Sequence, residues 1–527
     1  MAAREASTLA SLRSRCASLR RARESASSPG TLELKHFVER VRAQAQRVRE
    51  EVVVLGVALL SLAVHGHFIL PGLGEQDAAR FARIAFFWHV RGKISFDDVG
   101  YQIRTSTLYL QLERVLLDHG VSMHALIDWL NWSAVGFGTA YSVAFYVLCR
   151  YVTTRPVAVA ATVVHALTPA FWLANLYGMP TVPGMFCFLL GLIAFLSASR
   201  MSVSSARDRV GFYLRLFTAL VGMTLAMTLK SDLALGGGAF LAVAFARSTQ
   251  RFRFACYAAA IVVGGTLGSI AYAHAVVLPS AVTSSATGGL VDFLKNWNKS
   301  FEIDFDALGN DTNNSTISRC VGGVLFSVIV LAVCYGLVIG GRFRKQTLLA
   351  LLWGLPPILA WGVRFGNSAR HNVPAFPPLV LLSVIFLFEI VKYDVRRGAA
   401  LVAATVLASY CSNTSGENSL RPQSNLLGLN ETMARFTRSL HERARDIAAS
   451  PAQKRALVGG YLDAYAEFEL LSSMPHAAID NSGDHWVITD GDRTTVFDYD
   501  VKNSTARTVA RRWKERGYEP FSLSFRL

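Results

Sequence analysis

Two carboxylates lie two residues apart in a polar stretch that follows the first long apolar segment. The stretch reads Gly72-Leu-Gly-Glu75-Gln-Asp77-Ala-Ala-Arg80. Apolar surroundings favour the protonated form of an aspartate, while Arg80, Arg83 or Arg104 would favour the ionised form. An ionised aspartate with little hydration is suited to general-base catalysis. The alternative is that Asp77 only caps a helix predicted over 78–91.

Basic side chains near the ends of later apolar segments form a second group. Lys230 and Asp232 lie between two apolar segments, where they could simply form an ion pair or extend toward water. A later turn contains Arg364, Arg370 and His371 and leads into Val373-Pro-Ala-Phe-Pro-Pro378. Arginine presents a rigid fork of donors to phosphate oxygens. The sequence therefore predicts a phosphate site at this turn.

The elements that must hold these side chains are membrane helices. The 527 residues are 52% hydrophobic and 17% charged, whereas a soluble chain carries about 25% charged residues. This composition excludes a soluble enzyme, a disordered chain and a disulfide scaffold. The net charge of +16 could suggest nucleic acid, but the basic residues are spread between apolar segments instead of gathered on one solvated domain.

Eleven stretches are predicted to span the membrane, since a bilayer core of roughly 30 Å needs about 20 apolar residues. They are 52–72, 124–149, 156–176, 180–199, 211–229, 232–247, 254–277, 320–341, 347–363, 373–392 and 398–411. Every second loop is short and basic, as expected on the cytosolic side. The predicted domains are a basic cytosolic tail (1–50), a membrane domain (51–411) and a lumenal C-terminal domain (412–527).

Glycosylation sequons agree with this orientation. Eight of the fifteen asparagines begin an Asn-X-Ser/Thr sequence, which is modified on the lumenal side. Asn131 lies at the start of a span, too close to the bilayer for modification. The other seven lie in the predicted lumenal segments 278–319 and 412–527: Asn298, Asn310, Asn313, Asn314, Asn413, Asn430 and Asn503. The predicted location is the endoplasmic reticulum membrane.

The first lumenal loop, 73–123, and the C-terminal domain have their own predicted structure. Apolar residues at helical spacing predict an interfacial helix over 76–91, with Phe81, Ile84, Phe87 and Trp88 in the headgroup boundary. A second helical stretch, 105–118, would lie beside it. The C-terminal domain is predicted to be a small α+β domain. It would have a helix near 431–449 and strands at 486–489 and 495–499 joined by an Asp490-Gly-Asp turn.

These residues resemble the GT-C glycosyltransferases, which are integral membrane enzymes that use polyprenyl-phosphate sugars. Glu75-Gln-Asp77 is similar to the acidic motif in the first lumenal loop of that superfamily. Further similarity, to the protein O-mannosyltransferase and aminoarabinose-transferase branch, lies in Ala78-Ala-Arg-Phe-Ala82, Arg104-Thr-Ser-Thr-Leu-Tyr109 and Arg370-His-Asn-Val-Pro-Ala-Phe-Pro-Pro-Leu379. The resemblance covers roughly residues 50–411.

The resemblance implies an all-α polytopic GT-C fold and an inverting hexosyltransferase. Asp77 would be the catalytic base and Glu75 its supporting carboxylate. The donor-phosphate candidates are Lys230, Arg364, Arg370 and His371, and the other substrate-binding candidates are Arg80, Arg104, Tyr109 and Asp232. The sugar, with mannose as the best guess, would pass from dolichyl or polyprenyl phosphate to a hydroxyl of a glycan, glycolipid or protein. The short loop 278–319 leaves no room for MIR-type repeats, which argues against protein O-mannosylation proper.

Other functions remain as alternatives. A transporter or lipid scramblase would be polytopic too, but it would place ionisable residues near the bilayer midplane and show related halves. The sequence shows neither feature. A noncatalytic membrane scaffold with a lumenal interaction domain is the third reading. The sequence predicts membrane lipid but no nucleic acid as a partner, and it leaves open a divalent metal at the acidic motif.

Overall fold

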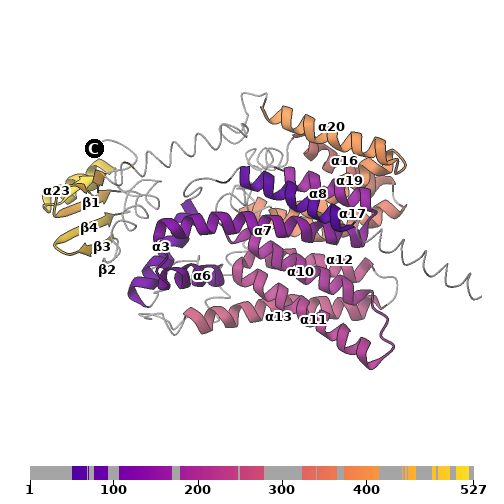
Figure 1. Cartoon of the computed structure of the whole chain (residues 1–527), viewed down its shortest axis with the longest axis horizontal. Helices are drawn as coiled ribbons and strands as arrows, with labels where there is room; N and C mark the ends of the chain where they lie inside the picture. Colours follow the sequence, from indigo (N-terminus) through magenta and orange to yellow (C-terminus); the bar gives the residue numbers. More distant parts are fainter. Residues whose placement is uncertain are drawn as a thin grey trace, which may run out of the picture. The chain divides into compact units, whose positions relative to one another are not determined.

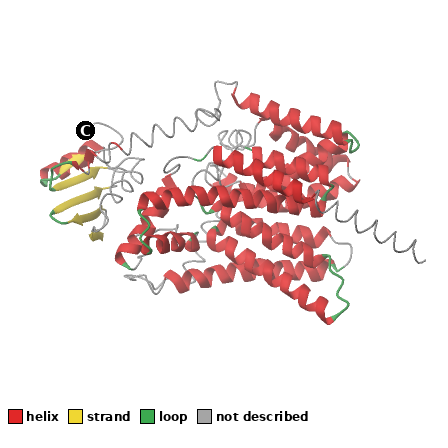
Figure 2. Cartoon of the chain, in the orientation of Figure 1, coloured by secondary structure: helices red, strands yellow, loops and turns green. Residues whose placement is uncertain are grey.

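The computed structural model describes residues 50–67, 69, 76–92, 106–168, 179–246, 250–277, 323–339, 341–364, 373–414, 442, 446–447, 449–458, 478–481, 485–498 and 506–521. The chain divides into two compact units, Met1–Gly56 and Val57–Leu527. Among the described residues of the second unit helices predominate, and the strands lie in its C-terminal part (Figure 2).

The described residues between 50 and 414 are built mainly from helices (Figure 1). The first described helix is Glu50–His67. The first loop contributes α3 (Gln76–Arg91) and α6 (Thr107–Asp118). The remaining helices are α7 (Met123–Val152), α8 (Arg155–Leu167), α10 (Thr181–Ser199), α11 (Ala206–Leu229), the 3-10 helix η1 (Ser231–Gly237), α12 (Gly238–Ala246), α13 (Arg251–Val277), α16 (Gly323–Ile339), α17 (Gly341–Arg364), the 3-10 helix η3 (Val373–Ala375), α19 (Phe376–Ile390) and α20 (Val395–Thr414).

A helix lies at each of the eleven stretches predicted to span the membrane. Among the described residues, six helices are long and apolar enough to cross a bilayer: Glu50–His67, Met123–Val152, Thr181–Ser199, Ala206–Leu229, Arg251–Val276 and Val373–Ile390. Of the others, α8 is a shorter apolar helix that ends at Leu167, and α17 is continuous but contains Pro356 and Pro357. The polytopic helical fold is confirmed, and the number of eleven crossings stays a prediction.

Glycines let α10 and α11 approach closely. A Cβ atom on Gly222 of α11 would lie 2.8 Å from the Gly191 Cα of α10 and 2.9 Å from the carbonyl oxygen of Cys187. Helices in lipid gain little from burying apolar area against each other, so their association depends on such close packing. The two glycines therefore fix the spacing of this helix pair.

The helices α11 and α13 run parallel, because the chain returns between them through η1 and α12. A Cβ on Gly264 would touch Leu220, and one on Gly268 would touch Thr224, so the contacts advance together along both helices. The C-terminal ends of α11 and α13 therefore lie at the same end of the bundle. The charge pattern predicts that this end is lumenal.

The C-terminal part contains strands β1 (Lys454–Val458), β2 (Ala478–Asn481), β3 (His485–Asp490), β4 (Arg493–Asp498) and β5 (Glu519–Phe521) and the helix α23 (Ala506–Glu515). The sheet order is β2-β3-β4-β1-β5, with β1 parallel to β4 and β5. The predicted hairpin is confirmed as antiparallel β3 and β4, with Gly491 at φ +58 in its turn. Val509 and Trp513 of α23 pack in the core of this sheet. Most of the helix predicted near 431–449 lies outside the described residues.

Candidate functional site

The helices α3 and α6 of the first loop pack against each other. Each presents a face of large side chains at helical spacing, and such faces pair to exclude water. The buried side chains include Phe81, Ile84, Ala85 and Trp88 on α3, and Tyr109, Leu110, Glu113 and Leu117 on α6. The pair thus has its own small core, and one member of that core is a carboxylic acid.

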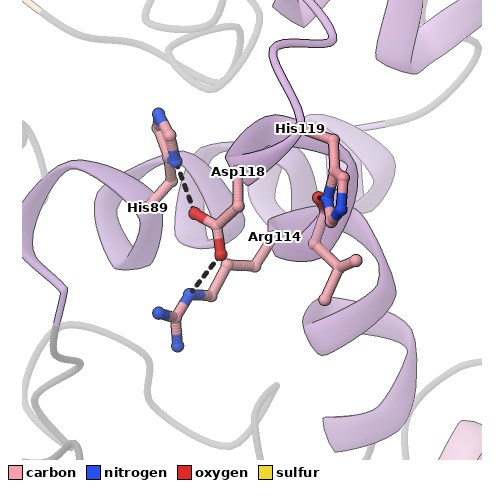
Figure 3. A network of polar contacts seen from close by, with 5 residues as sticks. His89, Arg114, Asp118 and His119 are labelled. Carbon is pink, nitrogen blue, oxygen red and sulfur yellow. Dashed lines mark hydrogen bonds and ion pairs between the residues drawn. The ribbon is translucent and has the colours of Figure 1, made fainter.

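The pair is parallel, because three contacts advance together along both helices. The Phe81 and Tyr109 rings lie 5.9 Å apart, the Arg114 guanidinium lies 4.9 Å from the Trp88 ring centre, and His89 Nδ1 lies 2.6 Å from an Asp118 carboxylate oxygen. Figure 3 shows His89 and Arg114 each contacting one oxygen of Asp118. The N-terminal ends of the two helices therefore lie together. Asp77, the second residue of α3, and Ser106, just before α6, are at this shared end.

The α6 helix attaches this pair to the end of the bundle (Figure 1). The Tyr272 hydroxyl, near the C-terminal end of α13, donates to the side-chain oxygen of Gln111. The same helix also contacts α11. Because α11 and α13 end together, the pair lies at the end of the bundle where Lys230 follows α11.

Lys230 and Asp232 form an ion pair at this end. Lys230 Nζ lies 3.3 Å from an Asp232 carboxylate oxygen, and the side chains are only 12% and 16% exposed. An ion pair between Lys230 and Asp232 was one of the structures that the sequence predicted, and it is present. The 3-10 helix η1, which contains Asp232, contacts η3. Since η3 follows directly after residue 372, the fold brings the start of the tenth predicted span against the 3-10 helix that contains Asp232.

The predicted site residues are described to different extents. Asp77 and Arg80 lie in α3, and Arg364 is the last residue of α17; of these three, the structure describes the backbone. Asp77 is inside the first turn of α3 instead of at its cap, and a carboxylate in the first turn is still favoured by the helix dipole. Tyr109 is buried and packs edge-to-face on Phe81. The remaining candidates, Glu75, Arg104, Arg370 and His371, lie outside the described residues.

The predicted location of four aromatic and aliphatic side chains of α3 is wrong. Phe81, Ile84, Phe87 and Trp88 were expected in the headgroup boundary, yet each is at most 3% exposed within the protein. The physical reason is that α6 and α7 contact α3 and cover this face. An apolar face indicates burial, but its pattern is the same whether lipid or protein covers it.

Glu113 is a candidate that the sequence analysis did not select. Its side chain is fully buried, and within the described structure neither carboxylate oxygen has a hydrogen-bond partner. Burial raises the pKa of Glu113 well above its usual value. Burial likewise raises the pKa of Tyr109. The sequence feature that could have indicated Glu113 is an acidic residue at a core-facing position of an amphipathic helix.

A polar cluster inside the bundle is a second feature that the sequence analysis missed. Ser61 Oγ lies 2.9 Å from Ser142 Oγ and 3.1 Å from His65 Nδ1. The Tyr141 hydroxyl lies 3.4 Å from His165 Nε2. All five side chains are buried. Polar side chains of this kind hold membrane helices together, and these link the first described helix, α7 and α8.

The described residues do not contain a cluster of three or more histidine, cysteine, aspartate or glutamate side chains that could hold a metal ion. Glu75 and the side chain of Asp77 are outside this set. A divalent metal at the acidic motif therefore stays a prediction.

Comparison with known proteins identifies the fold. Neither a protein-family model nor a curated protein sequence matches the chain. The chain is similar to the structure of ArnT from Cupriavidus metallidurans bound to undecaprenyl phosphate, with a TM-score of 0.54 and 12% identity over 92% of this chain and 90% of ArnT. The structure of apo ArnT matches with a TM-score of 0.51 and 15% identity over 81% of this chain and 85% of ArnT. AglB from Archaeoglobus fulgidus, an archaeal oligosaccharyltransferase, matches with a TM-score of 0.49 and 13% identity over 80% of this chain and 64% of AglB. The likeness to ArnT confirms the predicted GT-C fold.

Proposed function

We propose that the chain is a membrane glycosyltransferase that takes its sugar from a polyprenyl-phosphate donor. The observation that carries this proposal is the meeting of distant segments at one end of the bundle. These segments are the α3 and α6 pair, whose α6 contacts α11 and α13, the Lys230–Asp232 ion pair that follows α11, and η3, which contacts η1. ArnT, which has a similar fold, has been observed with undecaprenyl phosphate bound, and this supports a lipid-linked donor here.

Asp77 is the proposed general base. The first turn of a helix carries partial positive charge, which favours an ionised carboxylate there. Because α3 and α6 are parallel, two helix N-termini contribute this charge at the same end of the pair. Glu75 is proposed to support Asp77, and Arg80 and Arg104 to contact substrate near it. Tyr109, which is buried against Phe81, is proposed to hold this end of the helix pair in place instead of contacting substrate.

The donor phosphate is proposed to meet a group of cations. Arg364 ends α17, Arg370 and His371 precede η3 in the sequence, and Lys230 follows α11. Stabilising the negative charge that develops on a leaving phosphate is usually the largest catalytic contribution. The ion pair with Asp232 would hold the Lys230 ammonium at a fixed position, so that little reorganisation is needed when the phosphate arrives.

The proposed reaction is a single inverting displacement. An acceptor hydroxyl loses its proton to Asp77 and attacks the anomeric carbon opposite the phosphate. The new glycosidic C–O bond forms as the bond between the anomeric carbon and the phosphate oxygen breaks, and the lipid phosphate leaves with the electron pair. We propose dolichyl phosphate as the carrier, mannose as the first sugar to test, and the lumenal face of the endoplasmic reticulum as the location.

The test is transfer by purified full-length protein from a panel of polyprenyl-phosphate sugars, followed by mass spectrometry. Asp77→Asn removes the base and is expected to lower the transfer rate by about 100-fold or more, the usual contribution of a positioned base. Asp118→Asn is the matched control, because it makes the same chemical change on the same helix pair at the far end from Asp77. Normal turnover by Asp77→Asn would contradict the assignment. Lack of turnover of every donor by the wild type would contradict the function.

A further inference from the structure

The core of the α3 and α6 pair contains an acid that has no polar partner. Glu113 is 0% exposed, and both of its carboxylate oxygens lack hydrogen bonds in the described structure. The indole nitrogen of Trp88 and the hydroxyl of Ser106, in the same helix pair, are also buried without hydrogen bonds there. Buried polar groups are normally satisfied, so such exceptions call for an explanation.

Glu113 occupies a position on α6 where an apolar residue would be expected. Leu110, Glu113 and Leu117 follow one another at helical spacing along the buried face. A leucine at the central position would fill the space without a desolvation cost, and apolar replacements of buried charged groups are often neutral or stabilising. An ionised carboxylate without a partner is very costly in such surroundings. The carboxyl is therefore neutral while α6 is packed on α3.

The surrounding titratable groups leave Glu113 without a countercharge. On α6 itself these are Tyr109, Arg114 and Asp118. On the elements packed against α6 they are Arg83 and His89 of α3, His124 and Asp128 at the start of α7, Lys230 at the end of α11, and Tyr272 and His274 of α13. In the described structure none of them forms an ion pair or hydrogen bond with the Glu113 carboxyl.

Glu113 is connected to the proposed catalytic end through one layer of packing. Tyr109 lies one turn before Glu113 on α6, and its ring packs on Phe81 of α3. Phe81 in turn lies one helical turn after Asp77. A displacement of α6 from α3 would therefore remove the support of the first turns of α3, where the general base is proposed to lie.

We propose that Glu113 is a positioning residue whose neutral carboxyl seats α6 against α3, and that ionisation of this carboxyl releases α6 and stops sugar transfer. The effect on transfer rests on the function proposed above. The packing of α6 against α3 by a neutral Glu113 carboxyl does not depend on that proposed function.

The experiment compares four forms of the full-length protein in lipid nanodiscs: the wild type, Glu113→Gln, Glu113→Leu and Asp118→Asn. Glu113→Gln keeps the size and neutrality of the carboxyl but cannot ionise. Glu113→Leu is a second non-ionising variant that keeps the side-chain volume. Asp118→Asn removes a carboxylate of the same helix that contacts His89 of α3, so it controls for the loss of a charged contact between the two helices. The measurements are the infrared carbonyl band of protonated carboxylic acid and the rate of transfer, each followed from neutral to alkaline pH.

The wild type and Asp118→Asn are expected to show a protonated-acid band at neutral pH that both Glu113 variants lack. As this band disappears with rising pH, their transfer rate should fall by roughly tenfold per pH unit, the slope of a single ionisation. Both Glu113 variants should lack this decline. Absence of the band from the wild type, or the same alkaline decline in the wild type and both variants, would overturn the proposal. So would failure of both variants to fold, because a neutral or apolar side chain should satisfy the site.

The two proposals fail in distinguishable ways. If the wild type turns over none of the donors, the proposed function fails, while the infrared band and its titration still decide whether Glu113 is neutral in the folded protein. If the wild type transfers sugar and both Glu113 variants keep its alkaline decline, the transferase assignment stands and the role of Glu113 is rejected.

Discussion

Two carboxylates near the predicted lumenal end show how much a residue's surroundings decide its chemistry. Asp232 has the Lys230 ammonium 3.3 Å away. Glu113, on α6, is more deeply buried and lacks a cation or donor in the described structure. A buried charge is tolerated when it is paired and is costly when it is not. The first carboxylate therefore suits a fixed ion pair, which is proposed to lie beside the donor phosphate, and the second suits the proposed proton-dependent contact between helices.

The raised pKa of Glu113 predicts how stability depends on pH. The folded state holds the proton to higher pH than the unfolded state does, so the wild type loses stability as pH rises from the unfolded pKa through the folded pKa. Glu113→Gln has no such loss. Its advantage over the wild type should be absent at pH values below the unfolded pKa and grow by about 1.4 kcal/mol per pH unit above it.

Thermal unfolding in detergent at a series of pH values measures this difference. Asp118→Asn, on the exposed side of the same helix, should not gain stability with pH in this way. A gap between Glu113→Gln and the wild type that stays constant across the series would rule out a raised pKa for Glu113.

At the scale of elements, the direction of α6 is the decisive feature. Two helices joined by a short loop are normally antiparallel, but residues 92–106 form a connection long enough for the chain to return to the start of α3. The contacts between Phe81 and Tyr109 and between His89 and Asp118 show that it does so. The parallel direction places Ser106 at the same end as Asp77. An antiparallel α6 would place its other end, near Asp118, beside the acidic motif.

The close approach of α10 and α11 predicts a specific sensitivity to side-chain size. Gly222→Val places methyl groups where a Cβ alone already meets the Gly191 Cα at 2.8 Å. The helices must then separate, and we expect a loss of about 1 to 3 kcal/mol, typical of overpacking. Gly136→Val on α7 is the matched control, since a Cβ there meets nothing within 4 Å. Thermal unfolding of both variants in detergent tests this, and equal effects of the two substitutions would contradict it.

At the scale of the whole molecule, the open question is orientation in the membrane, and glycosylation can answer it. We expect modification at sequons in 278–319 and 412–527 and none at Asn131, whose side chain is 4% exposed within α7. Of the seven predicted acceptors, Asn413 lies in the last turn of α20 and the others lie outside the described residues. Glycopeptide mass spectrometry of protein from a eukaryotic host would show the pattern. A glycan on Asn131, or none on any of the other seven, would contradict the proposed orientation.

The sequence by itself determined the kind of protein and the places of its helices. A run of apolar residues is a local property, and in lipid a helix satisfies its own backbone hydrogen bonds, so length and hydropathy suffice to locate α7, α10 or α11. The hairpin of β3 and β4 was equally predictable, because an Asp-Gly pair between alternating strands specifies a turn. The pairing of Lys230 with Asp232 also follows from their closeness along the chain.

Only the tertiary structure decided what covers each apolar face and which helix ends meet. Hydropathy does not distinguish a face covered by lipid from one covered by protein, which is why Phe81 and Trp88 of α3 were assigned to the headgroup boundary although α6 and α7 bury them. For the same reason Glu113 counted as an ordinary polar residue of an amphipathic helix. Its burial depends on α3, more than twenty residues earlier in the chain. Local pattern fixes where a helix forms, but long-range packing fixes which side chains lose water, and in this protein the loss of water sets the chemistry of Glu113.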